Sequence, residues 1–185
     1  MFGDTVSEEQ KYNSVSLEKI FDKPQAGEWG KDDPDGMGTP VLRTTNFTDE
    51  GYIDYSDVAT RIIDSKKIEK KSISSGDILI EKSGGSSDKP VGRVVFFDGE
   101  DGRYLNNNFT ACLHLNGTYK VSNLYVFYFM FVNYWSKGTE LYEGKTTGIH
   151  NLRLGDYLKN TKIPLAPTEL QEEFEVMARQ SDKSK

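Results

Sequence analysis

The pattern of apolar and polar positions is clearest in residues 76–97, where two short apolar runs flank a polar segment. Residues 77–80 and 91–97 are rich in β-branched and aromatic side chains, which is typical of strands. Residues 82–90 contain glycines, serines and a proline, a composition typical of turns. We therefore predict a β-hairpin with a long polar tip, and such tips usually carry contacts rather than core. An ordinary surface hairpin explains the same pattern.

Similar runs predict further strands, and one long pattern predicts a helix. Residues 121–137 are long enough for a helix with Ser122 as its N-cap. Aromatic side chains at helical spacing are more often core than a stacking platform for nucleic-acid bases, so we assign those of this helix to the core. We also predict strands at residues 40–45, 106–115 and 162–165, an amphipathic turn or short helix at 13–22, a solvated helical turn at 64–75, and loops at 25–39 and 140–154.

The last predicted element is a helix that begins after a proline. Thr168 at the N-cap and Gln171 three residues later fit a capping box. An apolar seam follows at Leu170, Phe174 and Met177, with the spacing of a coiled coil. Because so short a seam cannot hold a coiled coil alone, the helix either packs on the domain or begins a longer helix. The whole pattern predicts an α+β fold, a mixed and largely antiparallel β domain with packed helices, followed by this C-terminal helix.

Charge is distributed unevenly along the 185 residues, although the formal total is −6 at pH 7. Residues 1–60 hold 5 basic and 13 acidic side chains, residues 61–97 hold 8 and 5, and residues 103–165 hold 7 and 3. The net charges are therefore −8, +3 and +4 in these stretches. Because the centre is basic, the negative total does not exclude binding to a nucleic acid.

The composition is that of a soluble globular protein of about one domain, with 36% hydrophobic and 28% charged residues. No apolar run approaches the roughly 20 residues that span a bilayer, and the N-terminus lacks an export signal. We therefore expect a cytoplasmic protein without membrane contact. The lone Cys112 cannot form an internal disulfide, and its apolar surroundings predict a buried thiol.

No metal, cofactor or catalytic site is predicted. Residues 32–36, DDPDG, suggest a calcium loop, but an EF-hand alignment places Lys31 and Leu42 at its first and last ligand positions. His114 and Cys112 are too few for a metal site. The sequence also lacks a glycine-rich nucleotide loop, an Asn-Pro-Pro-Tyr methyltransferase motif and a recognisable Ser-His-Asp arrangement.

Four segments, in order along the chain, resemble one protein family. They are GTPVLRTTNFTDEGYID (38–54), SSGDILIEKSGGSSDKPVGRVVFF (74–97), GKTTGIHNLRLGDYLKNTKIPL (144–165) and APTELQEEF (166–174). Together they resemble the DNA-specificity subunit of type I restriction-modification systems, and in particular one target-recognition domain with the start of its spacer helix. The resemblance divides the chain into an N-terminal tail (1–12), a target-recognition domain (13–166) and the start of a spacer helix (167–185).

The resemblance implies a protein without catalytic residues or cofactors that binds double-stranded DNA. Its implied partners are the methyltransferase (modification) subunits and the restriction/translocase subunit, and alone it should neither methylate nor cut DNA. Full specificity subunits resemble two such units in tandem, whereas this sequence has one, so it resembles a natural half-subunit or a truncated form. Self-association as a half-subunit would restore two units, although the short helix argues against such pairing.

The segments 82–93 and 145–153 supply side chains of the types that bind DNA. Arginine and lysine pair with guanine edges, asparagine pairs with adenine, and serine, threonine and lysine hold phosphates. The predicted DNA-binding set is Arg43, Lys82, Ser83, Gly84, Gly85, Lys89, Arg93, Lys145, Thr146, Thr147, His150, Asn151 and Arg153, and the predicted partner-helix seam is Leu170, Phe174 and Met177.

Within this set, Lys82 and Lys145 are the candidates for phosphate contacts. The candidate base readers are Arg43, Arg93, His150 and Asn151. Two structural alternatives stay open, in which Arg93 pairs with a carboxylate such as Asp88 and Asn151 caps a turn.

Two other functions are compatible with the sequence. A protein-interaction domain would use the aromatic residues 121–135 and the final helix to dock a partner. A small hydrolase would use carboxylates such as Asp77 and Glu81, but a Gly-Asp pair before a strand is ordinarily turn chemistry.

Overall fold

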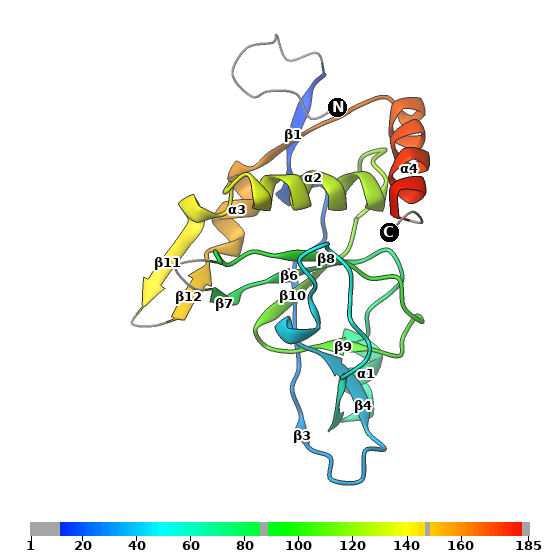
Figure 1. Ribbon diagram of the computed structural model, residues 1–185, viewed down its shortest axis with the longest axis vertical. Coiled ribbons are helices and arrows are strands. Elements are labelled where there is room, and N and C mark those ends of the chain that lie inside the picture. The colour runs from blue at the N-terminus through cyan, green and yellow to red at the C-terminus, as the bar shows by residue number, and fades with distance from the viewer. Residues whose placement is uncertain (1–11, 86–88, 147–148, 183–185) are drawn as a thin grey trace.

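A four-stranded antiparallel sheet lies at the centre of the computed structural model, which describes residues 12–85, 89–146 and 149–182 (Figure 1). Its strands are β2 (Gln25–Ala26), β10 (Thr110–Leu113), β6 (Ile78–Glu81) and β8 (Val94–Phe96), in that order. The predicted hairpin strands, β6 and β8, pair with Ile78 opposite Phe96 and Ile80 opposite Val94. Every residue of β6 and β10 is buried, which explains why their sequences are mostly apolar, with only Glu81 and Thr110 polar, rather than alternating.

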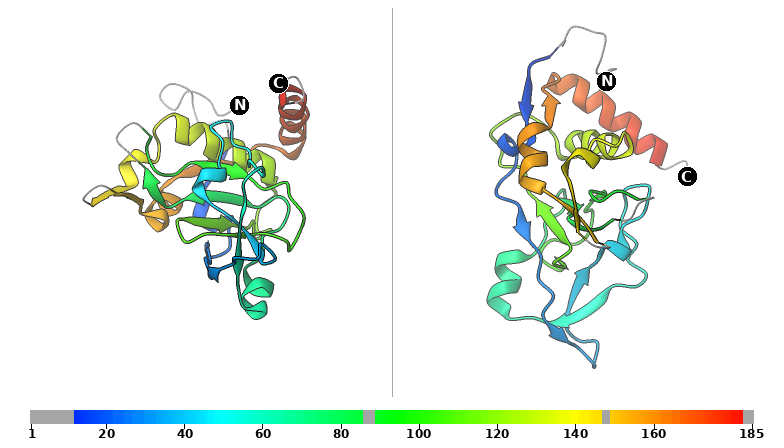
Figure 2. Two further views of the ribbon diagram at one scale, coloured as in Figure 1. Left: turned by 60° about the horizontal axis from the view of Figure 1, so that its bottom comes forward. Right: turned by 90° about the vertical axis from the view of Figure 1, so that its left-hand side faces the viewer.

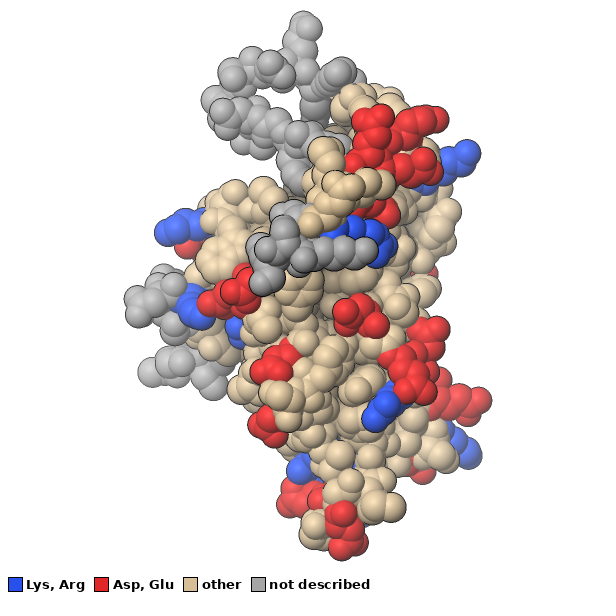
Figure 3. All heavy atoms as spheres, turned by 45° about the vertical axis from the view of Figure 1, so that its right-hand side comes forward, with Lys and Arg blue, Asp and Glu red and all other residues tan. Residues whose placement is uncertain are grey.

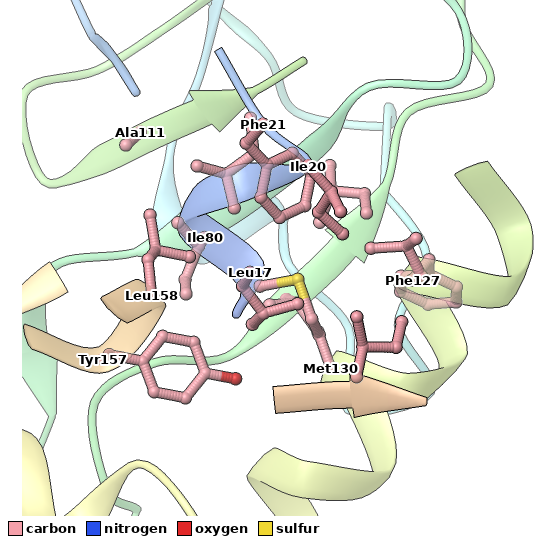
Figure 4. Close-up of a cluster of buried hydrophobic side chains, with 14 of the residues drawn as sticks. Leu17, Ile20, Phe21, Ile80, Ala111, Phe127, Met130, Tyr157 and Leu158 are labelled. Atoms are coloured by element: carbon pink, nitrogen blue, oxygen red, sulfur yellow. The ribbon is translucent and has the colours of Figure 1, made fainter. Parts of the chain in front are cut away.

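Helix α2 (Asn123–Trp135) packs across this sheet, as the aromatic pattern predicts (Figure 1). The Ser122 hydroxyl caps it by accepting a hydrogen bond of 3.1 Å from the Tyr125 amide. Tyr125, Phe127 and Met130 are buried in the main core. Figure 4 shows Phe127 and Met130 in this core together with Leu17 of the N-terminal segment. The prediction of an aromatic core helix is therefore confirmed.

The N-terminal segment and the segment before the last helix close the other side of this core. Strand β1 (Ser14–Ser16) pairs antiparallel with β13 (Lys162–Pro164), and the two lie side by side in the right-hand view of Figure 2. A short 3-10 helix, η1 (Leu17–Lys19), follows β1 and contacts α3 (Leu154–Asn160). The Tyr157 hydroxyl of α3 donates 3.0 Å to Asn133 of α2, and burial raises the pKa of this phenol.

A second lobe lies at the opposite end of the long axis from α2 (Figure 1). Its sheet has the order β3 (Lys31–Asp32), β5 (Ala59–Ile62), β4 (Thr39–Leu42) and β9 (Leu105–Asn106), and only β4 and β9 are parallel within it. Helix α1 (Ser65–Lys71) follows β5 and has no buried residue, as the lysine-rich pattern predicts. A 3-10 helix, η2 (Thr44–Asn46), follows β4. A second core beneath the central sheet joins the two lobes through Leu42, Leu79 and Phe97.

Two segments predicted as loops contain strands, so those predictions are wrong. Residues 25–39 include β2 and β3, because their backbones pair with β10 and β5 although only Ala26 in these two strands is apolar. Residues 140–154 form a 3-10 helix, η3 (Glu140–Tyr142), and the hairpin β11 (Glu143–Thr146) and β12 (Ile149–Leu152). Short surface strands of this kind need no apolar run, because backbone hydrogen bonds hold them.

The C-terminal helix α4 spans Thr168–Asp182, but the predicted capping box is wrong. Gln171 is buried, and its side chain forms hydrogen bonds to groups outside α4. Its Oε1 accepts from the Ser122 amide (2.9 Å), and its Nε2 donates to the carbonyls of Lys120 (3.1 Å) and Ala166 (2.8 Å). Gln171 therefore fastens α4 to the start of α2, a contact between segments about 50 residues apart that local spacing could not indicate.

The predicted seam of α4 divides into a packed part and an exposed part. The Phe174 ring packs edge-on against Tyr125 and Tyr128 of α2, with centroid distances of 6.3 and 5.4 Å. Met177 is 58% exposed, so the seam does not face the domain along its whole length. Acidic side chains gather over this helix in Figure 3, and its sequence supplies Glu169, Glu172, Glu173 and Glu175.

Replacing Phe174 with Ala should lower the free energy of unfolding by about 2 kcal/mol, because the change removes a partly buried ring and its aromatic contacts. The matched control is Met177→Ala, which should change stability by less than about 0.5 kcal/mol since its side chain is mostly exposed. Urea denaturation of the two variants measures the difference. Equal losses from both changes would contradict the division of the seam.

Candidate nucleic-acid interface

The two segments predicted to bind DNA lie together in one small sheet. Residues 82–90, predicted as a hairpin tip, contain the strand β7 (Ser83–Gly85). This strand pairs antiparallel with β12, which also pairs with β11, so the order is β11-β12-β7 (Figure 1). Ser83 lies opposite Asn151 and Gly85 opposite His150, with an irregular register between His150 and Asn151. Strands from the two segments therefore lie side by side in one sheet, and we call the surface of residues 83–85, 143–146 and 149–152, together with the neighbouring Lys82 and Lys89, the β7–β12 face.

Side chains as well as backbones join β7 to β12. The Ser83 hydroxyl donates to the Asn151 side-chain oxygen at 2.5 Å, so this bond holds Asn151 across the two strands. Gly84 has a φ of 131°, which favours glycine, and lies exposed beside this pair. At Gly85 a Cβ would lie 2.6 Å from the Val91 nitrogen, so only glycine lets β7 approach the end of its own loop. Local backbone geometry therefore explains why glycine occupies both positions of the segment.

A buried carboxylate also lies in this sheet. Glu143 starts β11, and its Oε1 accepts a hydrogen bond of 2.7 Å from the Val91 amide. Its Oε2 lies 3.1 Å from Nδ1 of His150 on the paired strand. Glu143 therefore fixes both the end of the 82–90 segment and the ring of a candidate base reader.

The lysines of this surface differ in their environments. Lys82 is half-buried, which lowers the pKa of its ammonium group, and repulsion from Lys71 lowers it further. Lys89 is exposed and pairs with Asp49 at 2.8 Å, a contact that lowers the pKa of that carboxyl. Lys145 lies in β11 opposite His150.

Three candidates of the predicted set fall where little or nothing is described. For Lys145 and Thr146 the structure describes only the backbone, and Thr147 lies outside the described residues.

The Arg93 guanidinium bonds to protein groups and is mostly buried, so we remove Arg93 from the candidate base readers. Its Nε lies 3.2 Å from Glu81 Oε2, and its two terminal nitrogens donate to the carbonyls of Phe47 and Thr44, both at 3.1 Å. Asp49 lies 3.7 Å away. Among the described residues Arg93 therefore pairs with the carboxylates of the buried Glu81 and of Asp49, as the alternative proposed, whereas Asp88, the carboxylate named in that alternative, lies outside the described residues.

The other two arginines of the set also bond to protein groups. Arg43 donates to the carbonyl (2.9 Å) and carboxylate (3.1 Å) of Asp57 beside η2. Arg153 reaches Asp156 at 3.2 Å and the Leu141 carbonyl at 3.0 Å, and half of its side chain stays exposed. Exposed ion pairs of this kind are weak enough to be exchanged for a phosphate.

The structure adds Phe109 to the surface, a residue that the sequence placed in a buried strand. Its side chain is 52% exposed, and its carbonyl accepts from the amides of Lys82 (2.7 Å) and Ser83 (3.1 Å). Its own amide donates to the side chain of the buried Asn107. The only signal in the sequence is the run Asn106–Asn108 before it, since three polar residues are unusual at the start of an apolar run.

The carboxylates considered for hydrolysis are committed to internal bonds. Asp77 accepts from the Ser74 amide (2.9 Å) and from the Cys112 thiol (3.3 Å), and lies 2.6 Å from His114 Nδ1. Burial raises the pKa of that thiol, as expected for an inert cysteine. No cluster of three potential metal ligands occurs among the residues that the structure describes. Within the same residues, no helix has the length and apolar character needed to cross a membrane.

Comparisons with known proteins identify solved structures with a similar fold. No family model matches the sequence, and no curated protein is significantly similar to it. A chain from a structure describing complex assembly and conformational transition of the type I restriction-modification system matches with a TM-score of 0.63 and 17% identity, covering 99% of this chain and 41% of that one.

Two further solved structures match in the same way. The S subunit of a type I restriction-modification system from M. genitalium gives a TM-score of 0.54 at 17% identity, over 86% of this chain and 36% of that one. The HsdS subunit from Thermoanaerobacter tengcongensis gives 0.59 at 18% identity, over 99% and 40%.

These matches identify an α+β fold, largely antiparallel, with a C-terminal helix. More particularly, it is the fold of one part of a type I restriction-modification S subunit, and this confirms the resemblance at the level of the fold. The chain spans about two-fifths of the length of these relatives.

Proposed function

We propose that this chain recognises a specific sequence in double-stranded DNA for a type I restriction-modification system. In this proposal it has no catalytic residues and directs methyltransferase and restriction subunits to the target. The observation that carries the proposal is the pairing of β7 with β12, which joins the two segments chosen for their DNA-binding chemistry into one surface. The likeness to S subunits supports the same assignment.

The distribution of charge supports the β7–β12 face rather than the face that carries α4. Four glutamates lie on α4, and Figure 3 shows acidic side chains over it. The β7–β12 face lies on the other side of the molecule in Figure 1 and includes Lys82, Lys89 and Lys145. Phosphates should therefore meet less repulsion at the β7–β12 face.

Selection of bound duplexes from a random DNA pool should enrich one short motif. Affinity for that motif should fall steeply as salt rises, because phosphate contacts release counterions. The measurement is sequencing of the selected pool, followed by titration of the motif and a scrambled duplex at several salt concentrations. A pool that stays random would contradict the proposal. It would favour the alternative of a protein-interaction domain, in which apolar docking depends little on salt.

A further inference from the structure

Glu143 is the one acidic side chain that the structure places within the sheet β11-β12-β7 among the described side chains, and it is almost completely buried there. Only 7% of the side chain is exposed. Its two oxygens have different neighbours, since the Val91 amide donates to Oε1 at 2.7 Å and His150 Nδ1 lies 3.1 Å from Oε2. The carboxylate therefore does more than balance charge, because each oxygen faces a particular nitrogen.

These contacts determine which nitrogen of His150 carries the proton. An ionised carboxylate only accepts hydrogen bonds, so beside such a carboxylate a neutral His150 ring carries its proton on Nδ1. Nε2 then has a lone pair and acts as an acceptor. The structure pairs Nε2 with no side chain or backbone group among the described residues, and 18% of the His150 side chain is exposed. His150 also lies opposite Gly85, which has no side chain to cover it.

We infer that Glu143 is a positioning residue that makes His150 a hydrogen-bond acceptor toward a DNA base. This inference rests on the proposed function and adds the chemistry of one base contact. In the major groove an acceptor pairs with an exocyclic amino group, N4 of cytosine or N6 of adenine, and not with guanine O6 or thymine O4. One position of the target should therefore require a base that presents an amino group.

The substitution Glu143→Gln reverses the polarity of the contact without changing its shape. The Val91 amide can only donate, so the amide oxygen of Gln must stay where Oε1 was. The amide nitrogen of Gln then faces His150 and donates to Nδ1, which moves the ring proton to Nε2. His150 becomes a donor toward DNA in this variant.

The expected result is a change in base preference at one position of the selected motif. Glu143→Gln should favour guanine or thymine there over the original base by about two- to tenfold, which is the effect of one hydrogen bond. Other positions should keep their preferences. Nitrogen NMR of the histidine ring in mildly alkaline buffer should show the proton on Nδ1 in the original chain and on Nε2 in the variant.

Glu140→Gln is the matched control, because it removes the same charge from a neighbouring glutamate that pairs with Lys137 in place of His150. It should leave base preference unchanged. His150→Ala is a second test that does not depend on the folding of Glu143→Gln, and it should abolish preference at the same single position.

Three results would overturn the inference while the proposed function stands. They are a motif whose preferences are unaffected by Glu143→Gln and His150→Ala, a ring proton that does not move between nitrogens, and an equal change with Glu140→Gln. If no motif is selected by the original chain, the proposed function itself fails, and the inference fails with it.

Discussion

Replacing Arg93 with Ala should lower the free energy of unfolding by about 3–5 kcal/mol, because it leaves a buried charge without its partner. The Glu81 side chain is 5% exposed and that of Arg93 17%, so the pair is largely shielded from water. The change also removes the donors for the carbonyls of Phe47 and Thr44. Arg93 therefore connects β8 to β6 and to the segment around η2, and its loss should loosen all three.

The loss should depend on pH in a defined direction. Burial raises the pKa of Glu81 above its ordinary 4.5, and Arg93 opposes this rise. Without Arg93 the folded-state pKa of Glu81 should rise further. When the folded-state pKa of a group is above its unfolded value, the stabilising contribution of that group is fully present below the unfolded pKa. This contribution is lost as the pH rises through the folded-state pKa. The deficit of Arg93→Ala should therefore be large at neutral pH and smaller near pH 4.5.

Urea denaturation at both pH values measures this deficit. Adding Glu81→Gln to Arg93→Ala should recover about 1–3 kcal/mol at neutral pH, since the buried group is then uncharged. Arg153→Ala is the control, because its partner Asp156 is exposed and the pair should contribute less than about 1 kcal/mol. A deficit of Arg93→Ala that matches the control, or that grows in acid, would show that the pair is not buried in solution.

Elements with strong local patterns were predictable from the sequence. The apolar runs of β6 and β8 flank a glycine-rich segment, and the aromatic run of α2 follows the cap Ser122. In these elements the buried side chains themselves set the pattern, because each strand or helix contributes a full apolar face to the core. The surface helix α1 was predictable for the opposite reason, since every position of it tolerates water.

Elements that depend on distant partners were not predictable. Nothing in Glu143–Thr146 indicates a strand until it is known that β12 lies beside it. Gln171 fits a capping box by spacing, yet it bonds to Ser122 and Lys120, and only the fold brings these groups near. The resemblance to S subunits could indicate the fold, but it could not supply these contacts.

The candidate site shows the same division. Residue types on two glycine-containing segments were enough to select one surface, because basic, amide and hydroxyl side chains occur together there although the chain as a whole is acidic. The roles of the individual residues depend on their neighbours in the fold, which the sequence does not indicate. Arg93 has a buried carboxylate as its partner, and the position of Glu143 beside His150 becomes visible only when β11 and β12 are paired.

The triple variant Lys82→Ala, Lys89→Ala and Lys145→Ala removes the three lysines of the β7–β12 face. Its DNA affinity should fall far below that of the original chain. Each phosphate contact contributes about 0.9 to the slope of log affinity against log salt, so the triple variant should lose about two to three units of slope. If the two proteins bind equally at 1 M salt, the triple variant should bind on the order of 100- to 500-fold more weakly than the original chain at 0.1 M salt. The preference for the selected motif over a scrambled duplex should change little, because phosphates carry no sequence information.

The matched control is a triple variant of α1, Lys66→Ala, Lys67→Ala and Lys70→Ala. It removes the same number of charges from exposed positions in the second lobe, away from β11 and β12 in Figure 1. If DNA lies on the β7–β12 face, this control should lose clearly less salt slope than the first triple variant, because its lysines lie in the second lobe and the Debye length is about 10 Å at 0.1 M salt. Lys71, which lies close enough to Lys82 to lower the pKa of that ammonium group, is left unchanged in the control. Equal slopes for the two triple variants would mean that net charge alone governs binding, and the face assigned here would then be wrong.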